Sequence, residues 1–280
     1  FRSNPLCWWL REKSEVMSRK TRLDWIISEN WNQQEISQRG KINDFILRKK
    51  ILLVGAGCVG ASIAEILVRS GVYSLTIIDS DIFEVGNLSR HVLNVDDIGG
   101  LKGLSLCNYL NSLNPHANIE VINNALTIDG ELKTNIDLDK YGIIIDCTGE
   151  NSVLDIIQSN NFKKRHIFAS VSVGLGAKRL YITLMNNQTF DFKAFFDLIA
   201  PYLQSERVLY NDYDLPRNGI GCWHPTFPGR SDDVWLAAST ATKAIENYII
   251  TESEKTISLV YEQRESNGFF EGYMLVDKTE

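Results

Sequence analysis

A glycine-rich loop between an apolar run and an amphipathic segment constrains this fold more than any other feature. Residues 51–54 (ILLV) are apolar at every position, which is typical of a strand buried on both faces of a parallel sheet. The loop that follows contains Gly55, Gly57 and Gly60, and residues 61–70 then carry apolar side chains at helical spacing. A G-x-G-x-x-G loop that joins a strand to a helix predicts nucleotide binding, because its backbone can approach a phosphate at the positive end of the helix.

Strand-like and helical segments alternate after this loop, as in a mostly parallel sheet with right-handed crossovers and helices on both faces. The last segment is expected to be a hairpin that turns at Asn267-Gly268. We therefore predict a Rossmann-like α/β fold that continues into antiparallel strands. The expected strands are 75–78, 119–122, 143–145, 167–171 and 179–185, the expected helices are 102–113, 152–157, 192–199 and 234–250, and the expected hairpin is 258–276.

Two domains are expected, a helical extension over residues 1–48 and the α/β domain over residues 49–280. The net charge of −6 argues against a nucleic-acid partner. No apolar stretch approaches the roughly 18 residues of a membrane span, and no signal peptide is visible, so a cytoplasmic location is predicted. The chain starts with Phe1 instead of Met, which we interpret as a fragment or a processed product.

The residues after the second expected strand carry more information than the glycines, which alone would favour NAD. Asp79 ends that strand, where a carboxylate can accept hydrogen bonds from ribose hydroxyls. D-x-D at 79–81, N-L-x-R at 87–90, G-x-x-K at 99–102 and N-P at 114–115 follow in order. Over residues 51–148 this pattern resembles the superfamily of ThiF, MoeB and the ubiquitin-activating enzymes, so residues 49–280 resemble a ThiF-type adenylation domain.

The resemblance implies adenylation of a C-terminal carboxylate with ATP and Mg²⁺. The transition state concentrates negative charge on phosphate, so the site needs positioned cations and donors more than a proton-transfer base. By the resemblance, Asp79 and Asp81 would belong to the nucleotide site, with Asp79 on the ribose. Asn87, Arg90 and Lys102 would contact the triphosphate, and both cations would act in catalysis.

Three parts of the pattern depart from the family. Residues 146–151 read DCTGEN where the family has D-x-T-D-N, so Asp146 and Glu150 are both proposed as Mg²⁺ ligands, with the choice between them left open. The C-x-x-C pairs of ThiF and MoeB, which bind zinc, are absent. No clean match exists for the arginine that a partner subunit often supplies in this family. The candidates for this arginine are Arg19, Arg22 and Arg39.

Cys222 lies in a segment, residues 205–232, that resembles the C-T-x-x-x-F-P segment of the ubiquitin-activating enzymes. Cysteine, phenylalanine and proline match in spacing, although Trp223 replaces the usual threonine. The resemblance implies that Cys222 captures the acyl group as a thioester, and a nearby His224 or a helix N-terminus would lower its pKa. The alternative is a buried structural thiol, which is how we interpret the other four cysteines.

The implied partners are a ubiquitin-like or other protein with a C-terminal carboxylate, an E2-like conjugating enzyme or domain that receives the thioester, and a second subunit in a homodimer or pseudo-dimer. Bacterial members that combine activating and conjugating domains are the most similar in these motifs. Three alternatives remain: a peptide-modifying adenylyltransferase without a thioester step, a NAD-dependent oxidoreductase, and a non-catalytic partner subunit.

Overall fold

The computed structural model describes two compact units, residues 1–36 and residues 37–280. The units therefore divide earlier than the predicted boundary at residue 48. The reason is that Ile42 and Ile46 are buried in the hydrophobic core of the second unit. The described residues are all except 1–4, 17, 19, 21–27, 124–126, 129–130, 133–135 and 210–228.

The described part of the first unit contains short helices joined by non-helical residues. These are α1 (Pro5–Arg11) and the π-helical η1 (Glu12–Val16), and α2 (Gln33–Ser37) lies at the boundary. α1 contains no buried residue, and Trp8 and Trp9 are both more than half exposed. Helices therefore occur in the described part of the extension, and its assignment as a helical domain stays a prediction.

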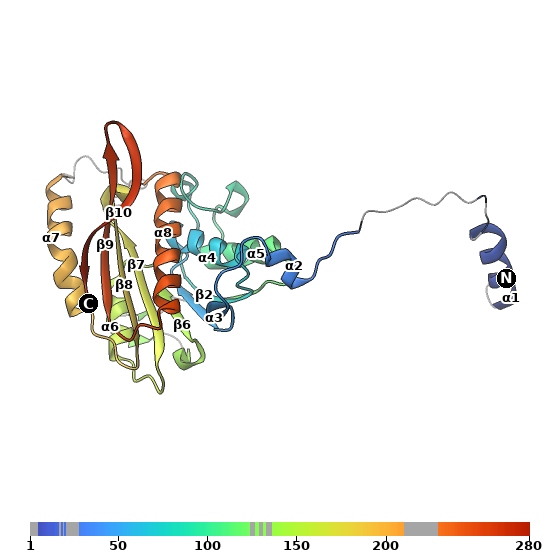
Figure 1. Ribbon diagram of the computed structural model, residues 1–280, viewed down its shortest axis with the longest axis horizontal. Helices are drawn as coiled ribbons and strands as arrows, with labels where there is room; N and C mark the ends of the chain where they lie inside the picture. The colour runs from blue at the N-terminus through green and yellow to red at the C-terminus, as the bar shows by residue number, and fades with distance from the viewer. Residues whose placement is uncertain are drawn as a thin grey trace. The chain divides into compact units, whose positions relative to one another are not determined.

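A mixed sheet of eight strands forms the centre of the second unit (Figure 1). Strands β1, β2, β3, β6 and β7 are parallel, whereas β8, β9 and β10 continue the sheet in antiparallel pairs. The order is β10-β9-β8-β7-β6-β1-β2-β3. The strands are β1 (Ile51–Val54), β2 (Ser74–Ile78), β3 (Asn118–Ile122), β6 (Ile143–Asp146), β7 (His166–Val173), β8 (Arg179–Asn187), β9 (Ile257–Ser266) and β10 (Phe269–Thr279), and β4 (Thr127–Ile128) and β5 (Glu131–Leu132) form a separate pair.

Two hydrophobic cores lie on the two faces of the sheet. Side chains alternate along each strand, so Leu53 of β1 belongs to one core and Leu52 to the other. The first core holds side chains of α4, α5 and α8, and the second holds those of α6 and α7. The long helices are α4 (Cys58–Arg69), α5 (Lys102–Leu113), α6 (Asn151–Ser159), α7 (Lys193–Leu209) and α8 (Ser231–Ile250); α3 (Asp44–Leu47) and the 3-10 turns η2 (Val85–Asn87), η3 (Val95–Asp97), η4 (Leu138–Lys140) and η5 (Leu175–Ala177) are short.

The sheet order places a crevice at the carboxyl ends of its central strands. From β1 the chain runs outward through β2 to β3, and it then returns to β6 on the other side of β1. Ligands of open α/β sheets bind at such a reversal of strand order. The predicted α/β class, the alternation of strands and helices, and the hairpin turn at Asn267-Gly268 are all confirmed. None of the helices in the described part of the chain has the length and apolar composition needed to cross a bilayer.

Candidate nucleotide site

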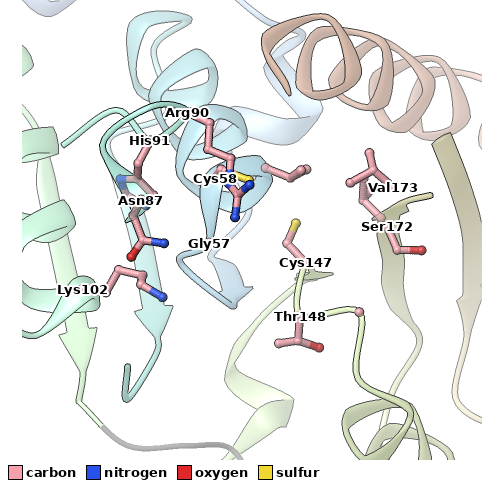
Figure 2. Close-up of a pocket in the computed structure, with 13 residues that line it drawn as sticks. Gly57, Cys58, Asn87, Arg90, His91, Lys102, Cys147, Thr148, Ser172 and Val173 are labelled. Carbon is pink, nitrogen blue, oxygen red and sulfur yellow. The ribbon is translucent and has the colours of Figure 1, made fainter. Parts of the chain in front are cut away.

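A cavity of about 330 Å³ opens at the carboxyl ends of β1, β6 and β7. Figure 2 shows Arg90, His91, Asn87 and Lys102 on one side and Cys147, Thr148, Ser172 and Val173 on the other. The lining is made by Gly57, Cys58, Val59, Asn87, Arg90, His91, Lys102, Cys147, Thr148, Gly149, Val171, Ser172 and Val173. Residues more than a hundred positions apart in the sequence therefore share one cavity.

The three glycines of the loop have different local roles. Gly55 has a φ of +91°, a conformation that side chains rarely tolerate. A Cβ on Gly60 would lie 2.1 Å from the carbonyl oxygen of Gly55, so the first turn of α4 packs directly on the loop. Gly57 caps α4 without a side-chain hydrogen bond, and a Cβ there would meet no protein atom within 4 Å. The N-terminus of α4 therefore faces open cavity, as phosphate binding requires.

Asp79 supports the loop from behind and does not line the cavity. Its carboxylate accepts hydrogen bonds from the backbone N–H groups of Ala56 (2.6 Å) and Asp81 (2.8 Å). Burial raises the pKa of Asp79, although these two N–H groups and the Lys102 ammonium favour its charged form. Each carboxylate oxygen keeps a second lone pair, which leaves Asp79 able to accept from a ribose hydroxyl. The contact with ribose stays a prediction.

Lys102 brings a buried ammonium group into the cavity from the first residue of α5. Its Nζ lies 2.9 Å from Oδ2 of Asp81, and its backbone N–H donates to the carbonyl oxygen of Asp81. The Lys102 side chain is 10% exposed and that of Asp81 is 69% exposed, so the ammonium group is fixed while its counter-ion faces solvent. A buried ammonium with a solvated partner is available to a more strongly charged anion such as a triphosphate.

Asn87 and Arg90 are held by a short turn, η2. The side chain of Asn87 accepts from the backbone N–H of Glu84 at 3.0 Å, while the Glu84 carboxylate caps the turn in return. The carbonyl oxygen of Asn87 accepts from the N–H groups of Arg90 and His91. Arg90 extends from this turn into the cavity, toward Cys58 (Figure 2).

His91 also lines the cavity, and the motif analysis gave it no role. Its Nδ1 accepts from the N–H of Leu93 at 3.2 Å, so the hydrogen is on Nε2, which donates to the carbonyl oxygen of Ala56 at 2.8 Å. Burial lowers the pKa of His91 to about 4. The hydrogen bond to the Ala56 carbonyl opposes this shift, whereas the nearby charge of Lys102 adds to it. A neutral imidazole thus ties the N-L-x-R turn to the glycine loop.

Asp146 lies beneath the cavity floor and not in its lining. Oδ1 accepts from the N–H (3.1 Å) and the hydroxyl (2.7 Å) of Thr148, and Oδ2 accepts from the Ser170 hydroxyl at 2.8 Å. Burial raises the pKa of Asp146. These contacts order the loop that carries Thr148 and Gly149, which do line the cavity.

Glu150 is exposed and also lies outside the lining, beside the hydroxyl of Ser152. Within the described residues, no group of three or more His, Cys, Asp or Glu side chains could hold a metal ion. A site of this kind suits Mg²⁺ only where phosphate oxygens and water supply most of the ligands, with at most one or two carboxylates from the protein. The assignment of Mg²⁺ to Asp146 and Glu150 stays a prediction.

Two thiols line the cavity, those of Cys58 and Cys147. Burial raises the pKa of Cys58, although Arg90 opposes this, and burial raises the pKa of Cys147 well above its ordinary value. Both thiols therefore keep their protons at neutral pH, and a protonated thiol is a poor nucleophile.

The structure brings together four of the residues that the motifs single out, namely Gly57, Asn87, Arg90 and Lys102. Ser172 and Val173 were missed; they follow the strand expected at 167–171 and form the carboxyl end of β7, which runs to Val173. Gly55, Gly60, Asp79, Asp81, Asp146 and Glu150 lie outside the lining, Arg39 is exposed in a turn, and Cys222, His224, Arg19 and Arg22 fall outside the described residues.

Comparison with known families decides between the nucleotide-binding folds that share such a loop. The ThiF family matches residues 28–267. The chain belongs to the ThiF family. The resemblance read from the D-x-D, N-L-x-R and G-x-x-K motifs is thereby confirmed, as is membership in the E1-like superfamily.

Curated relatives of this ThiF-family chain include two larger proteins. It is 37% identical over 225 residues to the ATP-dependent ubiquitin transferase-like protein Cap2 of Enterobacter hormaechei subsp. hoffmannii (strain UCI 50), covering 79% of this chain and 36% of Cap2. It is 34% identical over 128 residues to the adenylyltransferase and sulfurtransferase UBA4 of Candida albicans (strain SC5314), covering 45% of this chain and 28% of UBA4. The chain thus spans only about a third of the length of these relatives.

Solved structures share the fold at low sequence identity. Escherichia coli MccB with ATP superposes with a TM-score of 0.52 at 18% identity, covering 77% of this chain and 62% of MccB. PaaA superposes with a TM-score of 0.54 at 16% identity, covering 81% of this chain and 73% of PaaA. The arrangement of the sheet and helices is therefore one that known proteins adopt.

Proposed function

We propose that this chain uses ATP to adenylate the C-terminal carboxylate of a protein or peptide and then receives the acyl group on Cys222. The observation that carries the proposal is the convergence of Asn87, Arg90 and Lys102 on one cavity at the open N-terminus of α4. Membership in the ThiF family and the similarity to Cap2 and UBA4 support it.

The first step joins a substrate carboxylate oxygen to the α-phosphorus of ATP. The bond from that phosphorus to the bridging oxygen breaks, and pyrophosphate leaves with the electron pair. Negative charge gathers on the phosphates in this transition state, where fixed donors are most effective. Lys102 and Arg90 supply positive charge, Asn87 supplies an amide, and the α4 backbone supplies N–H donors. Mg²⁺, when bound to the triphosphate, would supply further charge neutralisation.

In the second step, the Cys222 thiolate attacks the acyl carbon and AMP leaves, which gives a thioester. The raised pKa values of Cys58 and Cys147 support Cys222 as the acceptor, because both cavity thiols keep their protons. A cysteine of an E2-like protein would then take the acyl group. A ubiquitin-like protein is the proposed substrate, and a dimer or pseudo-dimer is the proposed assembly.

Thermal melting with ATP plus Mg²⁺, compared with NAD, tests the nucleotide assignment. A ligand at 100 times its Kd adds about 2.7 kcal/mol of stability, so ATP is expected to raise the Tm by several degrees and NAD is not. Lys102→Ala is expected to lose most of this shift. Lys193→Ala is the matched control, because Lys193 also pairs with an aspartate, Asp197 at 2.6 Å, but on the surface.

Stabilisation by NAD alone would contradict the adenylation site and favour the oxidoreductase. Stabilisation by neither nucleotide would show that this chain does not bind ATP on its own, and it would favour the non-catalytic partner subunit. An ATP shift that is equal in the Lys102→Ala and Lys193→Ala variants would show that ATP binds elsewhere.

A reactive adenosine tests the thioester step separately. Adenosine with a 5′-vinylsulfonamide places an electrophile where the acyl phosphate would lie; a thiolate adds to its terminal vinyl carbon, and the π electrons take up a proton. Peptide mass spectrometry is expected to find the label on Cys222 and not on Cys58 or Cys147. Nucleotide binding without label on Cys222 would instead favour a peptide-modifying adenylyltransferase.

A further inference from the structure

Lysines and arginines gather at the amino ends of three neighbouring parallel strands, β1, β6 and β7. Ile51 pairs with Ile143, and Ile143 pairs with Ile167, so the residues before these positions lie side by side at one edge of the sheet. Neighbouring strands are about 4.8 Å apart, so one ligand can reach all three. The basic residues here are all exposed, and we call them the basic edge: Arg48, Lys49, Lys50, Lys140, Lys163, Lys164 and Arg165.

Most of the carboxylates described at this edge already have a partner. Glu254 pairs with Arg165 at 2.7 Å, and Asp44 pairs with a lysine outside the basic edge. Oδ1 of Asp139 lies 3.0 Å from Nε2 of His166. Within the described part of the chain, the other members of the basic edge form no ion pair. The chain as a whole has a net charge of −6, so this concentration of unpaired cations indicates an anionic partner.

A cavity of about 300 Å³ adjoins the basic edge, and Lys49 and Arg165 contribute to its lining. The apolar part of the lining is Phe45, Ile167, Tyr248 and Ile249. Phe45 is 53% exposed, which is high for an aromatic side chain. The stem of Lys49 packs on Gly142, where a Cβ would lie 2.8 Å from Lys49 Cδ. An apolar cavity and unpaired ammonium groups are thus adjacent.

Acidic residues around this cavity restrict the class of partner. Glu252 and Glu254 line the cavity itself, and Asp137 is exposed beside η4. A nucleic acid carries a charge at every phosphate, and an anionic membrane presents a continuous negative surface, so either would also meet these carboxylates. A polypeptide can place an apolar side chain in the cavity and its carboxylates on the lysines. The arrangement therefore favours an acidic polypeptide that contains an apolar residue.

We propose that the basic edge and its cavity bind an acidic segment of a partner protein, with one apolar or aromatic side chain of that segment in the cavity. This surface and the nucleotide cavity lie at opposite ends of the same strands and share no residue. Binding of such a segment therefore leaves the nucleotide cavity open, and it does not require the proposed adenylation.

Fluorescence anisotropy with the full chain tests this surface. The probe is a fluorescein-labelled peptide, Glu-Glu-Phe-Glu-Glu-Glu, and an analogue with serine in place of phenylalanine measures the contribution of the cavity. We expect the phenylalanine peptide to bind at low ionic strength and the serine peptide to bind about ten-fold more weakly, because its side chain buries little apolar area. Added salt should weaken the binding of both peptides, because exposed charges are screened.

Variants of the protein identify the surface that the peptide contacts. Lys49→Glu with Lys164→Glu should weaken binding of the phenylalanine peptide by about ten-fold or more. Phe45→Ala should reduce the difference between the two peptides. Lys178→Glu with Lys243→Glu is the matched control, because both lysines are exposed and neither forms an ion pair among the described residues. It changes the net charge equally and should bind the peptide as wild type does. Thermal melts check that every variant is folded.

Several outcomes would contradict this surface or its partner. Equal binding of the two peptides, equal binding by the two double variants, or no peptide binding at low ionic strength would overturn the surface. Oligothymidine or phosphatidylserine vesicles that bind more tightly than the peptide, and lose binding in Lys49→Glu with Lys164→Glu, would replace the acidic polypeptide by a nucleic acid or a membrane. Dimers that the same double variant dissociates would show that a second copy of the chain occupies the surface instead.

Discussion

At the scale of single residues, the candidate site combines two cations, Lys102 and Arg90, with a neutral histidine, His91. Lys102 and Arg90 bring positive charge to the cavity, while His91 stays neutral between them and the glycine loop. A protonated His91 would lose the hydrogen bond from Leu93 to Nδ1 and would face like charge. The neutral imidazole is therefore both a structural link and the form that these cations favour.

This arrangement predicts a loss of stability in mild acid. The pKa of His91 is about 4 in the folded chain against 6.5 for an ordinary histidine. Between these values the unfolded chain binds more protons, so the contribution of His91 is complete above pH 6.5 and is lost as the pH falls toward 4. The free energy of unfolding is therefore expected to fall by about 3 kcal/mol between pH 6.5 and pH 4, at 1.36 kcal/mol per unit of pKa.

Urea unfolding of wild type and His91→Gln across this pH range measures the effect. A glutamine stays neutral, and its amide can still donate to Ala56. The raised pKa values of Asp79 and Asp146 increase stability as the pH falls, opposite to the effect of His91. The quantity to compare is therefore the difference in unfolding free energy between wild type and His91→Gln at each pH. A difference in unfolding free energy that does not change with pH would contradict the neutral state of His91.

At the scale of elements, the glycine loop predicts two contrasting alanine variants. In Gly60→Ala the new Cβ would meet the Gly55 carbonyl at 2.1 Å, so the first turn of α4 must move. We expect a loss of about 3 kcal/mol of stability, as for an overpacked core position. In Gly57→Ala the Cβ meets no protein atom, and only the capping preference is lost, about 1 kcal/mol.

ATP binding should respond in the reverse order. Gly57→Ala projects its methyl group into the cavity, so it should weaken the ATP-induced Tm shift while the apoprotein remains folded. Chemical denaturation and ATP melts of both variants check this pair. If Gly57→Ala bound ATP as wild type does, the triphosphate could not lie at the N-terminus of α4.

Most elements could be predicted because their patterns are local and strong. The buried run at 51–54 and the helix at 102–113 match β1 and α5. A helix was expected over residues 192–199, but α7 continues to Leu209 and contains Pro201. Tyr202 and Leu203 pack against the second core, and this packing outweighs the hydrogen bond that the proline removes.

The candidate site could be predicted where its residues lie close together in the sequence. Asn87, Arg90 and Lys102 lie in one stretch with recognisable spacing, and all three line the cavity. The partnership of Asp146 with Ser170 and that of Glu206 with Leu175 depend on which strands and helices become neighbours. No local pattern records such contacts, so they required the fold.

At the scale of the whole molecule, the division into two units contrasts with the boundary expected at residue 48. Residues 37–47 were expected to be part of the helical extension, yet they belong to the second unit. Ile42 and Ile46 are 6% and 2% exposed in the core beside α8, and the Asn43 N–H donates to Glu246 of α8 at 2.8 Å. Three contacts in a short segment thus attach it to a helix two hundred residues away in the sequence.

Two truncations of the chain distinguish these boundaries. Deletion of residues 1–36 removes no core side chain of the second unit, so the Tm and the ATP-induced shift should stay near those of the full chain. Deletion of residues 1–48 also removes Ile42 and Ile46. Each buried aliphatic contributes about 2–5 kcal/mol, so the Tm should fall by roughly 10 °C or more.

Thermal melts of the three proteins, with and without ATP plus Mg²⁺, provide the measurement. The double substitution Ile42→Ala with Ile46→Ala in the full chain is the matched control, because it removes the same core side chains without shortening the chain. It should reproduce most of the loss seen on deletion of residues 1–48. Equal melting of both truncations would place the boundary at residue 48 after all, and a large loss on deletion of residues 1–36 would show that the first unit stabilises the second.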